Sequence, residues 1–294
     1  MISARPRIAL FLVLFLPPTP FLHAADTPSL ETALALFEAK RVPEAREQLV
    51  AIVAREPKNV RALRTLGLCE LKMRHREAAA DTFAKAVELD PRNHALLADY
   101  ASASFQRATE LGVSFRAIGF ARRGRNALEQ AVTLAPDIIG YREGLVQFYT
   151  RAPGFAGGSF DRAYAHIDEI TKRDPARGAI IRANTLCADQ RYEEALAGCE
   201  AFLRDHPDHY LALYTLGRIV SETDRDPVRG ETALRRCLEL TPRVEEPDHA
   251  AVHYRLGLIA EKDKRPADAR RSYQAALALE PAFSEATEAL TRLK

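Results

Sequence analysis

Apolar residues recur at helical spacing along most of the chain, and a proline follows each of seven such stretches. The prolines are Pro57, Pro91, Pro136, Pro175, Pro207, Pro242 and Pro281. Ala or Gly lies twelve positions before each of them, and apolar residues lie eight and five positions before it. These three positions share one helical face, because four and three residues each make about one turn. Since proline lacks an amide donor and restrains the residue before it, the pattern predicts seven helices that end beside these prolines.

A second helical stretch precedes each of these helices. Its clearest mark is a Leu-Gly pair, which occurs at Leu66-Gly67, Leu216-Gly217 and Leu256-Gly257. The prolines are separated by 32 to 45 residues, and one interval is 34 residues long. Neither helix of a pair can bury its apolar stripe alone, so we expect the pairs to fold as hairpins that stack on one another.

Two segments match a known repeat closely. They are Leu63…Leu66-Gly67…Ala79…Phe83…Ala86…Pro91 and Leu256-Gly257…Ala269…Tyr273…Ala276…Pro281. On these residues the chain resembles the tetratricopeptide repeat family. It departs from the family early in the first helix, where an aromatic residue is common and this chain has Leu63, Leu97 or His253.

The resemblance implies an all-α fold, a right-handed superhelical solenoid of about seven helical hairpins with a C-terminal capping helix. The solenoid is expected over residues 25–294. Its units are expected at residues 26–59, 60–93, 94–138, 139–177, 178–209, 210–244 and 249–283, with the terminal helix at 284–294. Asp248 is expected to cap the helix that opens the last hairpin.

Two of the units carry insertions. Around residues 103–124, apolar and aromatic residues such as Phe105, Val113 and Phe115 alternate with arginines. This segment is interpreted either as two lengthened helices or as a projecting element that docks an acidic partner. In the next unit, Pro153 and three glycines within residues 151–160 predict an ordered turn. A phosphate-binding loop is not expected there, because its Lys-Ser/Thr pair and a preceding strand are missing.

Residues 1–24 have the pattern of a secretory signal peptide. Arg5 and Arg7 precede an apolar run from residue 8 to residue 16, and prolines and small residues follow it. Cleavage after Ala24 and cleavage after Ala25 fit equally well. The apolar run is too short to span a bilayer as a helix, which needs about 20 residues. We therefore expect an exported protein, most simply periplasmic, with no membrane span after cleavage.

The charge of the mature chain excludes one class of partner. The whole chain has 42 Lys and Arg against 40 Asp and Glu. Residues 1–24 contain two Arg and no acidic residue, so their removal leaves equal numbers of basic and acidic residues. Binding to nucleic acid depends on an excess of basic groups near the phosphates, so no nucleic-acid partner is expected.

Candidate chemistry is sparse. His249 and His253 lie four residues apart on one helical face, a spacing that can hold zinc, but no third ligand is evident in the sequence. Cys187 and Cys199 fall on the two helices of one predicted hairpin and are either free buried thiols or a disulfide. No nucleophile elbow or other catalytic motif is present, so we expect neither an enzyme nor a bound cofactor.

Partner binding is what the resemblance implies instead. In the tetratricopeptide repeat family, the first helix of each hairpin lines a concave face that binds peptides or partner helices. Carried to this chain, the candidate contacts are Arg61, Arg64, Lys72, Gln106, Asn184, Arg218 and Tyr254. The first three could form a basic stripe for an acidic segment. The leading hypothesis is an exported, non-enzymatic scaffold for a protein or peptide partner; the alternative is a metal- or ligand-binding accessory protein that uses His249 and His253.

Overall fold

Helices alone make up the part of the chain that the structure describes. A computed structural model describes residues 28–223 and 225–293. Over these residues the chain forms fifteen α-helices, one short 3₁₀-helix and no β-strand. The expected all-α class is therefore confirmed. The predicted signal peptide, residues 1–24, lies outside the described residues.

The helices form seven consecutive pairs and a terminal helix. The pairs are α1 (Leu30–Glu38) with α2 (Val42–Arg55), α3 (Val60–Lys72) with α4 (Arg76–Leu89), α5 (His94–Glu110) with α6 (Phe115–Leu134), α7 (Ile139–Arg151) with α8 (Phe160–Arg173), α9 (Pro175–Ala188) with α10 (Tyr192–Asp205), α11 (Tyr210–Glu222) with α12 (Pro227–Leu238), and α13 (His249–Lys262) with α14 (Pro266–Leu279). Helix α15 (Ser284–Arg292) follows the last pair, and the 3₁₀-helix η1 (Gly154–Ala156) lies between α7 and α8.

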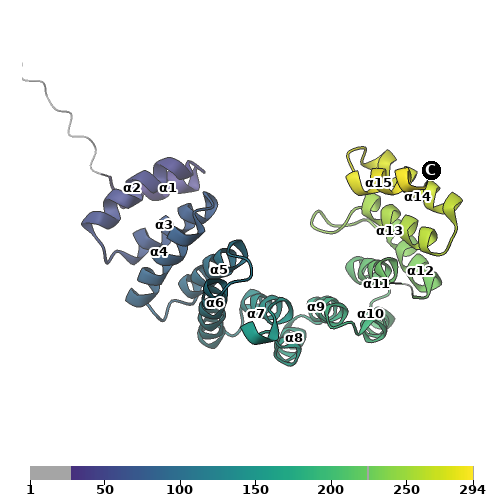
Figure 1. The fold of residues 1–294 in the computed structure, drawn as a ribbon, viewed down its shortest axis with the longest axis horizontal. Helices are drawn as coiled ribbons and strands as arrows, with labels where there is room; N and C mark the ends of the chain where they lie inside the picture. The colour runs from purple at the N-terminus through teal and green to yellow at the C-terminus, as the bar shows by residue number, and fades with distance from the viewer. Residues whose placement is uncertain (1–27, 224, 294) are drawn as a thin grey trace, which may run out of the picture.

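The hairpins follow one another along an arc. In Figure 1, α7, α9 and α11 lie on the inner side of the arc, whereas α8, α10 and α12 lie on its outer side. The main contacts join helices that are neighbours or next neighbours in the chain. The molecule is thus a solenoid in which each hairpin rests on the one before it.

Polar side chains and prolines define the helix ends. Asn59 caps α3 by accepting a hydrogen bond from the Ala62 amide at 3.0 Å, and the predicted cap Asp248 accepts one from the Ala251 amide at 2.9 Å. One boundary differs from its prediction: α9 begins at Pro175, not near residue 178. Proline is well tolerated in the first helical turn, where its missing amide has no partner to lose. Asp174 ends α8 and caps α9 at the same time.

The turn inside most hairpins contains a residue with left-handed backbone. Lys40, Arg74, Gln190 and Lys264 have φ near +60°. Glycine takes this role in the two irregular hairpins, with φ of 59° at Gly112 and 105° at Gly157. A left-handed residue at the end of a helix reverses the chain tightly, so the second helix packs directly against the first.

The core is a row of small clusters along the arc. In three of the hairpins a glycine of one helix faces a large side chain of its neighbour. A Cβ added to Gly67 on α3 would lie 2.7 Å from the Phe83 ring on α4. Gly257 has the same relation to Tyr273, and Gly217 to Leu234. The small residues of the repeat pattern therefore set how closely the helices approach.

Candidate partner-binding site

Polar side chains connect successive hairpins along the inner helices. Arg64 on α3 donates from Nε to Asp99 Oδ2 on α5 at 2.6 Å. Arg218 on α11 donates from Nη2 to Asn184 Oδ1 on α9, also at 2.6 Å. Each pair is separated by about one repeat in sequence. These contacts connect one hairpin to the next. They involve three of the predicted partner-binding residues, Arg64, Asn184 and Arg218.

The other predicted residues have varied surroundings. The Lys72 ammonium lies 5.6 Å from the centre of the Phe37 ring, and the Gln106 amide donates to Ser102 Oγ at 3.2 Å. Tyr254 is half-buried against the Tyr273 and Phe283 rings of the last hairpin. Arg61 is exposed. Because Arg64 and Lys72 already have partners within the chain, the basic stripe is less available than its sequence suggests, and its role in binding stays a prediction.

The two histidines that suggested a metal site have other contacts. His249 donates from Nε2 to the Leu240 carbonyl at 2.8 Å. Burial lowers the pKa of His253, and the neighbouring His249 lowers it further. Within the described ranges, no three His, Cys, Asp or Glu side chains gather in a way that could hold a metal ion. Among the residues that the structure describes, this pair has no third ligand.

The cysteines are free thiols in the structure. Cys199 is buried between α10 and its neighbours, and burial raises its thiol pKa to about 12. Cys187 on α9 is only half-buried. A high pKa suppresses the thiolate, so Cys199 is a packing residue rather than a nucleophile. The disulfide between Cys187 and Cys199 stays a prediction.

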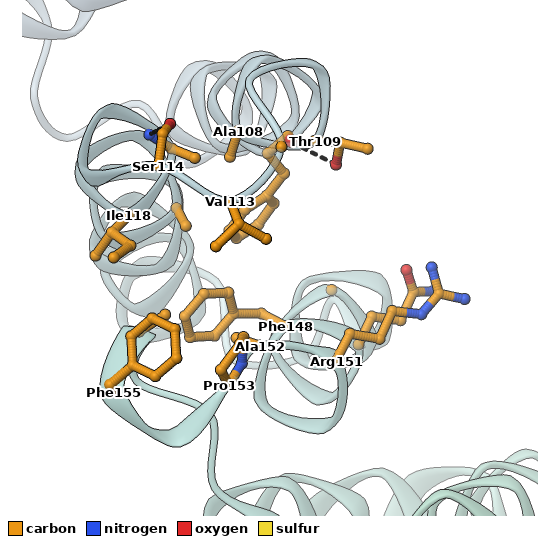
Figure 2. Close-up of a pocket in the computed structure, with 17 residues that line it drawn as sticks. Ala108, Thr109, Val113, Ser114, Ile118, Phe148, Arg151, Ala152, Pro153 and Phe155 are labelled. Atoms are coloured by element: carbon orange, nitrogen blue, oxygen red, sulfur yellow. Dashed lines mark hydrogen bonds between the residues drawn. The ribbon is translucent and has the colours of Figure 1, made fainter.

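A pocket of about 420 Å³ lies between the third and fourth hairpins, at the edge where their turns project. Its walls come from the end of α5, the start of α6, the end of α7 and the loop that follows α7. Figure 2 shows Val113, Ile118, Phe148 and Phe155 arranged around one common space. The charged side chain in its lining is Arg151. The pocket is therefore apolar with a basic edge.

The two insertions of the sequence create this pocket together. Helices α5 and α6 are 17 and 20 residues long, which confirms that the first insertion lengthens both helices. The second insertion folds back as a tight loop, in which the Gly158 amide donates to the Pro153 carbonyl at 3.1 Å. A Cβ at Gly158 would lie 1.7 Å from the Ala152 carbonyl oxygen, so only glycine fits there. Arg122 of α6 holds this loop by donating to the Phe155 carbonyl at 3.3 Å.

Large apolar side chains stand exposed in the pocket lining, at Val113 and Phe155, and next to it in the chain, at Phe115. Val113 is 97% exposed, Phe115 is 94% exposed and Phe155 is 66% exposed. Water-exposed apolar side chains grouped at one place are typical of interaction sites, since burial of their surface releases free energy. The sequence pattern indicated the apolar residues of the first insertion, but not that the loop of the second insertion would complete a pocket with them.

A polar hollow adjoins the pocket on the inner side of the arc. It measures about 450 Å³, lies between α7 and α9, and is lined by Glu143, Gln147, Thr150, Arg151 and Asn184 among others. Gln147 and Arg151 line both spaces. The Thr150 hydroxyl is buried there without a hydrogen-bond partner, and within the described part of the chain Arg151 has neither an ion-pair nor a hydrogen-bond partner. The two spaces form one candidate binding track across α7.

The stacked hairpins and this surface track define a class of protein, the helical-repeat solenoid that binds partners along its surface. Tetratricopeptide repeat family models match residues 30–94 and 250–283. With hairpins of the same kind between these two matches, the chain belongs to the tetratricopeptide repeat family. No curated protein matches it.

Solved structures with the same fold share little sequence with the chain. A tetratricopeptide repeat protein from Parabacteroides merdae has a TM-score of 0.59 at 16% identity, over 90% of this chain and 96% of its own. The C-terminal part of a repeat protein from Cytophaga hutchinsonii has a TM-score of 0.59 at 13% identity, over 89% and 99%. PilW, a type IV pilus biogenesis factor, has a TM-score of 0.51 at 16% identity, over 79% and 98%. At these identities the likeness shows the fold.

None of the described helices is both long and apolar enough to cross a bilayer.

Proposed function

We propose that the protein is an exported, non-enzymatic scaffold of the cell envelope that binds a protein or peptide partner along the inner side of its arc. The observation that carries this proposal is the continuous stack of hairpins, in which α7, α9 and α11 line the inner side of the arc. The signal-peptide pattern of residues 1–24 supports export to the periplasm.

The available surface suits binding better than catalysis. Catalytic groups usually have pKa values shifted by burial together with a specific charged partner, in an enclosed site. Here burial between helices raises the pKa values of tyrosines and cysteines such as Tyr210 and Cys237. Neither group lines the pocket or the hollow described above. The proposed mechanism is therefore surface complementarity without bond chemistry.

A capture experiment tests the inner surface. The tagged protein is purified from a periplasmic extract, and the proteins that co-purify with it are identified. Mass spectrometry of its N-terminus checks cleavage after Ala24 or Ala25. We expect a variant with Arg61, Arg64 and Lys72 changed to Glu to lose these partners. A matched variant carries the same changes at Lys58, Lys85 and Arg204, which are exposed at other places on the solenoid, and should keep them.

Two results would contradict the proposal. An unchanged set of partners in the first variant would exclude the inner stripe, and a protein that keeps residues 1–24 in the cytoplasm would exclude export. Circular dichroism of both variants controls for folding, because Arg64→Glu also removes the contact with Asp99.

A further inference from the structure

We infer that the pocket between the third and fourth hairpins binds an aromatic or large aliphatic side chain from a partner segment that carries acidic residues on both sides of this anchor. The inference rests on the proposed function, since it names the chemistry of a protein partner. It places the anchor at the turn edge of the solenoid, beside the inner helix α7.

The shape of the pocket favours an inserted side chain. The space of about 420 Å³ is hollow, and Phe105, Phe148 and Pro153 contribute apolar lining. Figure 2 shows Val113 and Phe155 on opposite sides of this space. An anchor that enters it is surrounded by apolar groups from two hairpins, which is the setting in which a single buried side chain supplies most of the binding energy. The flat surface of a lipid bilayer would leave the pocket unfilled.

The basic side chains around the pocket predict the charge of the partner residues beside the anchor. The two segments that line the pocket, residues 105–121 and 144–156, contain Arg107, Arg116 and Arg151 and one acidic residue, Glu110, which pairs with Arg107. Arg116 already pairs with Glu77 at 2.9 Å, and Arg122 is held by the Phe155 carbonyl. Arg151 has neither kind of partner within the described residues. A guanidinium group in this situation binds a carboxylate with good geometry, so acidic residues are expected next to the anchor.

The polar hollow indicates the path of the bound segment. In Figure 2 the Arg151 side chain extends away from the apolar space, and Arg151 also lines the hollow between α7 and α9. A segment anchored in the pocket can therefore cross α7 over Gln147 and Arg151. Beyond them it reaches the Asn184 amide, in the hollow that Thr150 also lines. The anchor thus occupies the apolar space, one acidic neighbour meets Arg151, and the backbone continues into the hollow.

The test uses three fluorescein-labelled peptides in which Phe, Leu or Trp stands between two pairs of Glu. Binding to the mature protein is followed by fluorescence anisotropy at physiological salt. We expect at least one peptide to bind with Kd below about 1 mM. The double variant Val113→Ser with Phe155→Ser should weaken it about tenfold or more, because the anchor loses two apolar walls. Arg151→Glu should weaken it about threefold or more, and peptides with Lys in place of Glu should bind more weakly.

Matched variants control for general effects. Val228→Ser with Leu279→Ser removes exposed apolar side chains from α12 and α14, and Arg204→Glu makes the same charge change on α10. Both should bind the peptides like the unchanged protein. Absence of binding by all three peptides, or equal binding by the pocket and control variants, overturns the inference.

Other occupants of the pocket give different results. Self-association that Val113→Ser with Phe155→Ser abolishes, measured by analytical ultracentrifugation, would assign the pocket to a second copy of the chain and overturn the inference. Sedimentation with phosphatidylglycerol vesicles that depends on the same residues, without peptide binding, would assign it to a membrane and also overturn it. If the peptides do not bind but the variant with Arg61, Arg64 and Lys72 changed to Glu loses its captured partners, the inference is wrong and the proposed function stands. If the peptides bind but that variant keeps its partners, only binding through these three residues is rejected.

Discussion

At the scale of single residues, backbone conformation decides which side chains the hairpin turns accept. Lys40, Arg74, Gln190 and Lys264 adopt left-handed φ although each carries a Cβ. An L-residue pays about 1–2 kcal/mol for this conformation. The tight packing of the two helices that the turn joins offsets this cost, so the sequence tolerates several residue types at these turns. Gly112 and Gly157 avoid the cost in the two hairpins that form the pocket.

Gly112→Ala isolates this backbone cost. No atom lies within 4 Å of a Cβ added at Gly112, so the substitution creates no clash, and its φ of 59° alone opposes the side chain. We expect a loss of about 1 kcal/mol in the free energy of unfolding. Gly119 on α6 also has open space around it but lies in a helix. Gly119→Ala should therefore gain about 0.5–1 kcal/mol from helix propensity.

Urea unfolding followed by circular dichroism, together with hydrogen exchange of α5 and α6, compares these two variants. Changes of the same sign in both would show that backbone conformation does not control this turn.

At the scale of helices, a repeated contact between a glycine and a large side chain sets the spacing within the second, sixth and last hairpins. The Phe83 ring covers Gly67 in the second hairpin, and the Tyr273 ring covers Gly257 in the last one. Between hairpins, ion pairs on the inner helices join residues about one repeat apart, as Arg64 and Asp99 do. These pairs are partly exposed, so each is worth about 0–1 kcal/mol, and the apolar contacts supply most of the stability.

Gly67→Ala should disturb the contact between α3 and α4. Its new methyl group would lie 2.7 Å from the Phe83 ring, which is fully buried and cannot move aside freely. We expect a loss of about 1–3 kcal/mol in the free energy of unfolding. In a Phe83→Leu background the same change should cost less, because the smaller side chain leaves room for the methyl group.

Gly198→Ala on α10 is the matched control for this helix substitution. A Cβ at Gly198 meets no atom within 4 Å, so its effect on stability should be neutral or favourable. Equal costs of Gly67→Ala with Phe83 and with Leu at position 83 would contradict steric control of the spacing. Gly67→Ala, Phe83→Leu, the double variant and Gly198→Ala are each compared with the unchanged protein by urea unfolding.

At the scale of the whole molecule, stability is distributed along a line. Separate apolar clusters follow one another from the first hairpin to the last, and the main contacts join only neighbouring or next-neighbouring helices. In such an arrangement each hairpin depends on the hairpins beside it and is little affected by distant ones. Local openings should therefore begin where a hairpin has only one neighbour, near the ends of the stack.

Removal of α15 tests this linear coupling. The helix covers the last hairpin through Ala289 and the partly buried Leu290 and Leu293, beside Tyr273. We expect a protein that ends at Phe283 to lose hydrogen-exchange protection in α13 and α14 and to keep it in α3 to α6. The full-length protein under the same conditions is the reference. A uniform loss of protection along the chain would show that the solenoid unfolds as one unit.

Sequence patterns predicted the helical fold because its determinants are local. The apolar positions before each proline form a helical stripe through backbone geometry alone, and a cap such as Asp248 bonds to amides only a few residues away. The start of α9 was misplaced because one residue, Asp174, serves the ends of two helices. Asp174 followed by Pro175 is itself a local start signal, a capping residue before a proline in the first turn, which the repeat spacing did not take into account.

The partners of the candidate site residues depend on how the hairpins pack, and the sequence pattern does not contain that information. Residue type suggested a free basic stripe at Arg64 and Lys72, but the partners of these side chains, Asp99 and Phe37, lie one repeat away. The pocket depends still more on packing, since Val113 and Phe155 belong to separate insertions.

By itself, then, the sequence determined the helices, their turns and their stacking as repeats, because these follow from backbone conformation and the burial of periodic apolar stripes. Only the tertiary structure decided which polar side chains remain available and where an apolar pocket opens. Both depend on the distance between groups remote in the chain, and that distance is set when neighbouring hairpins pack.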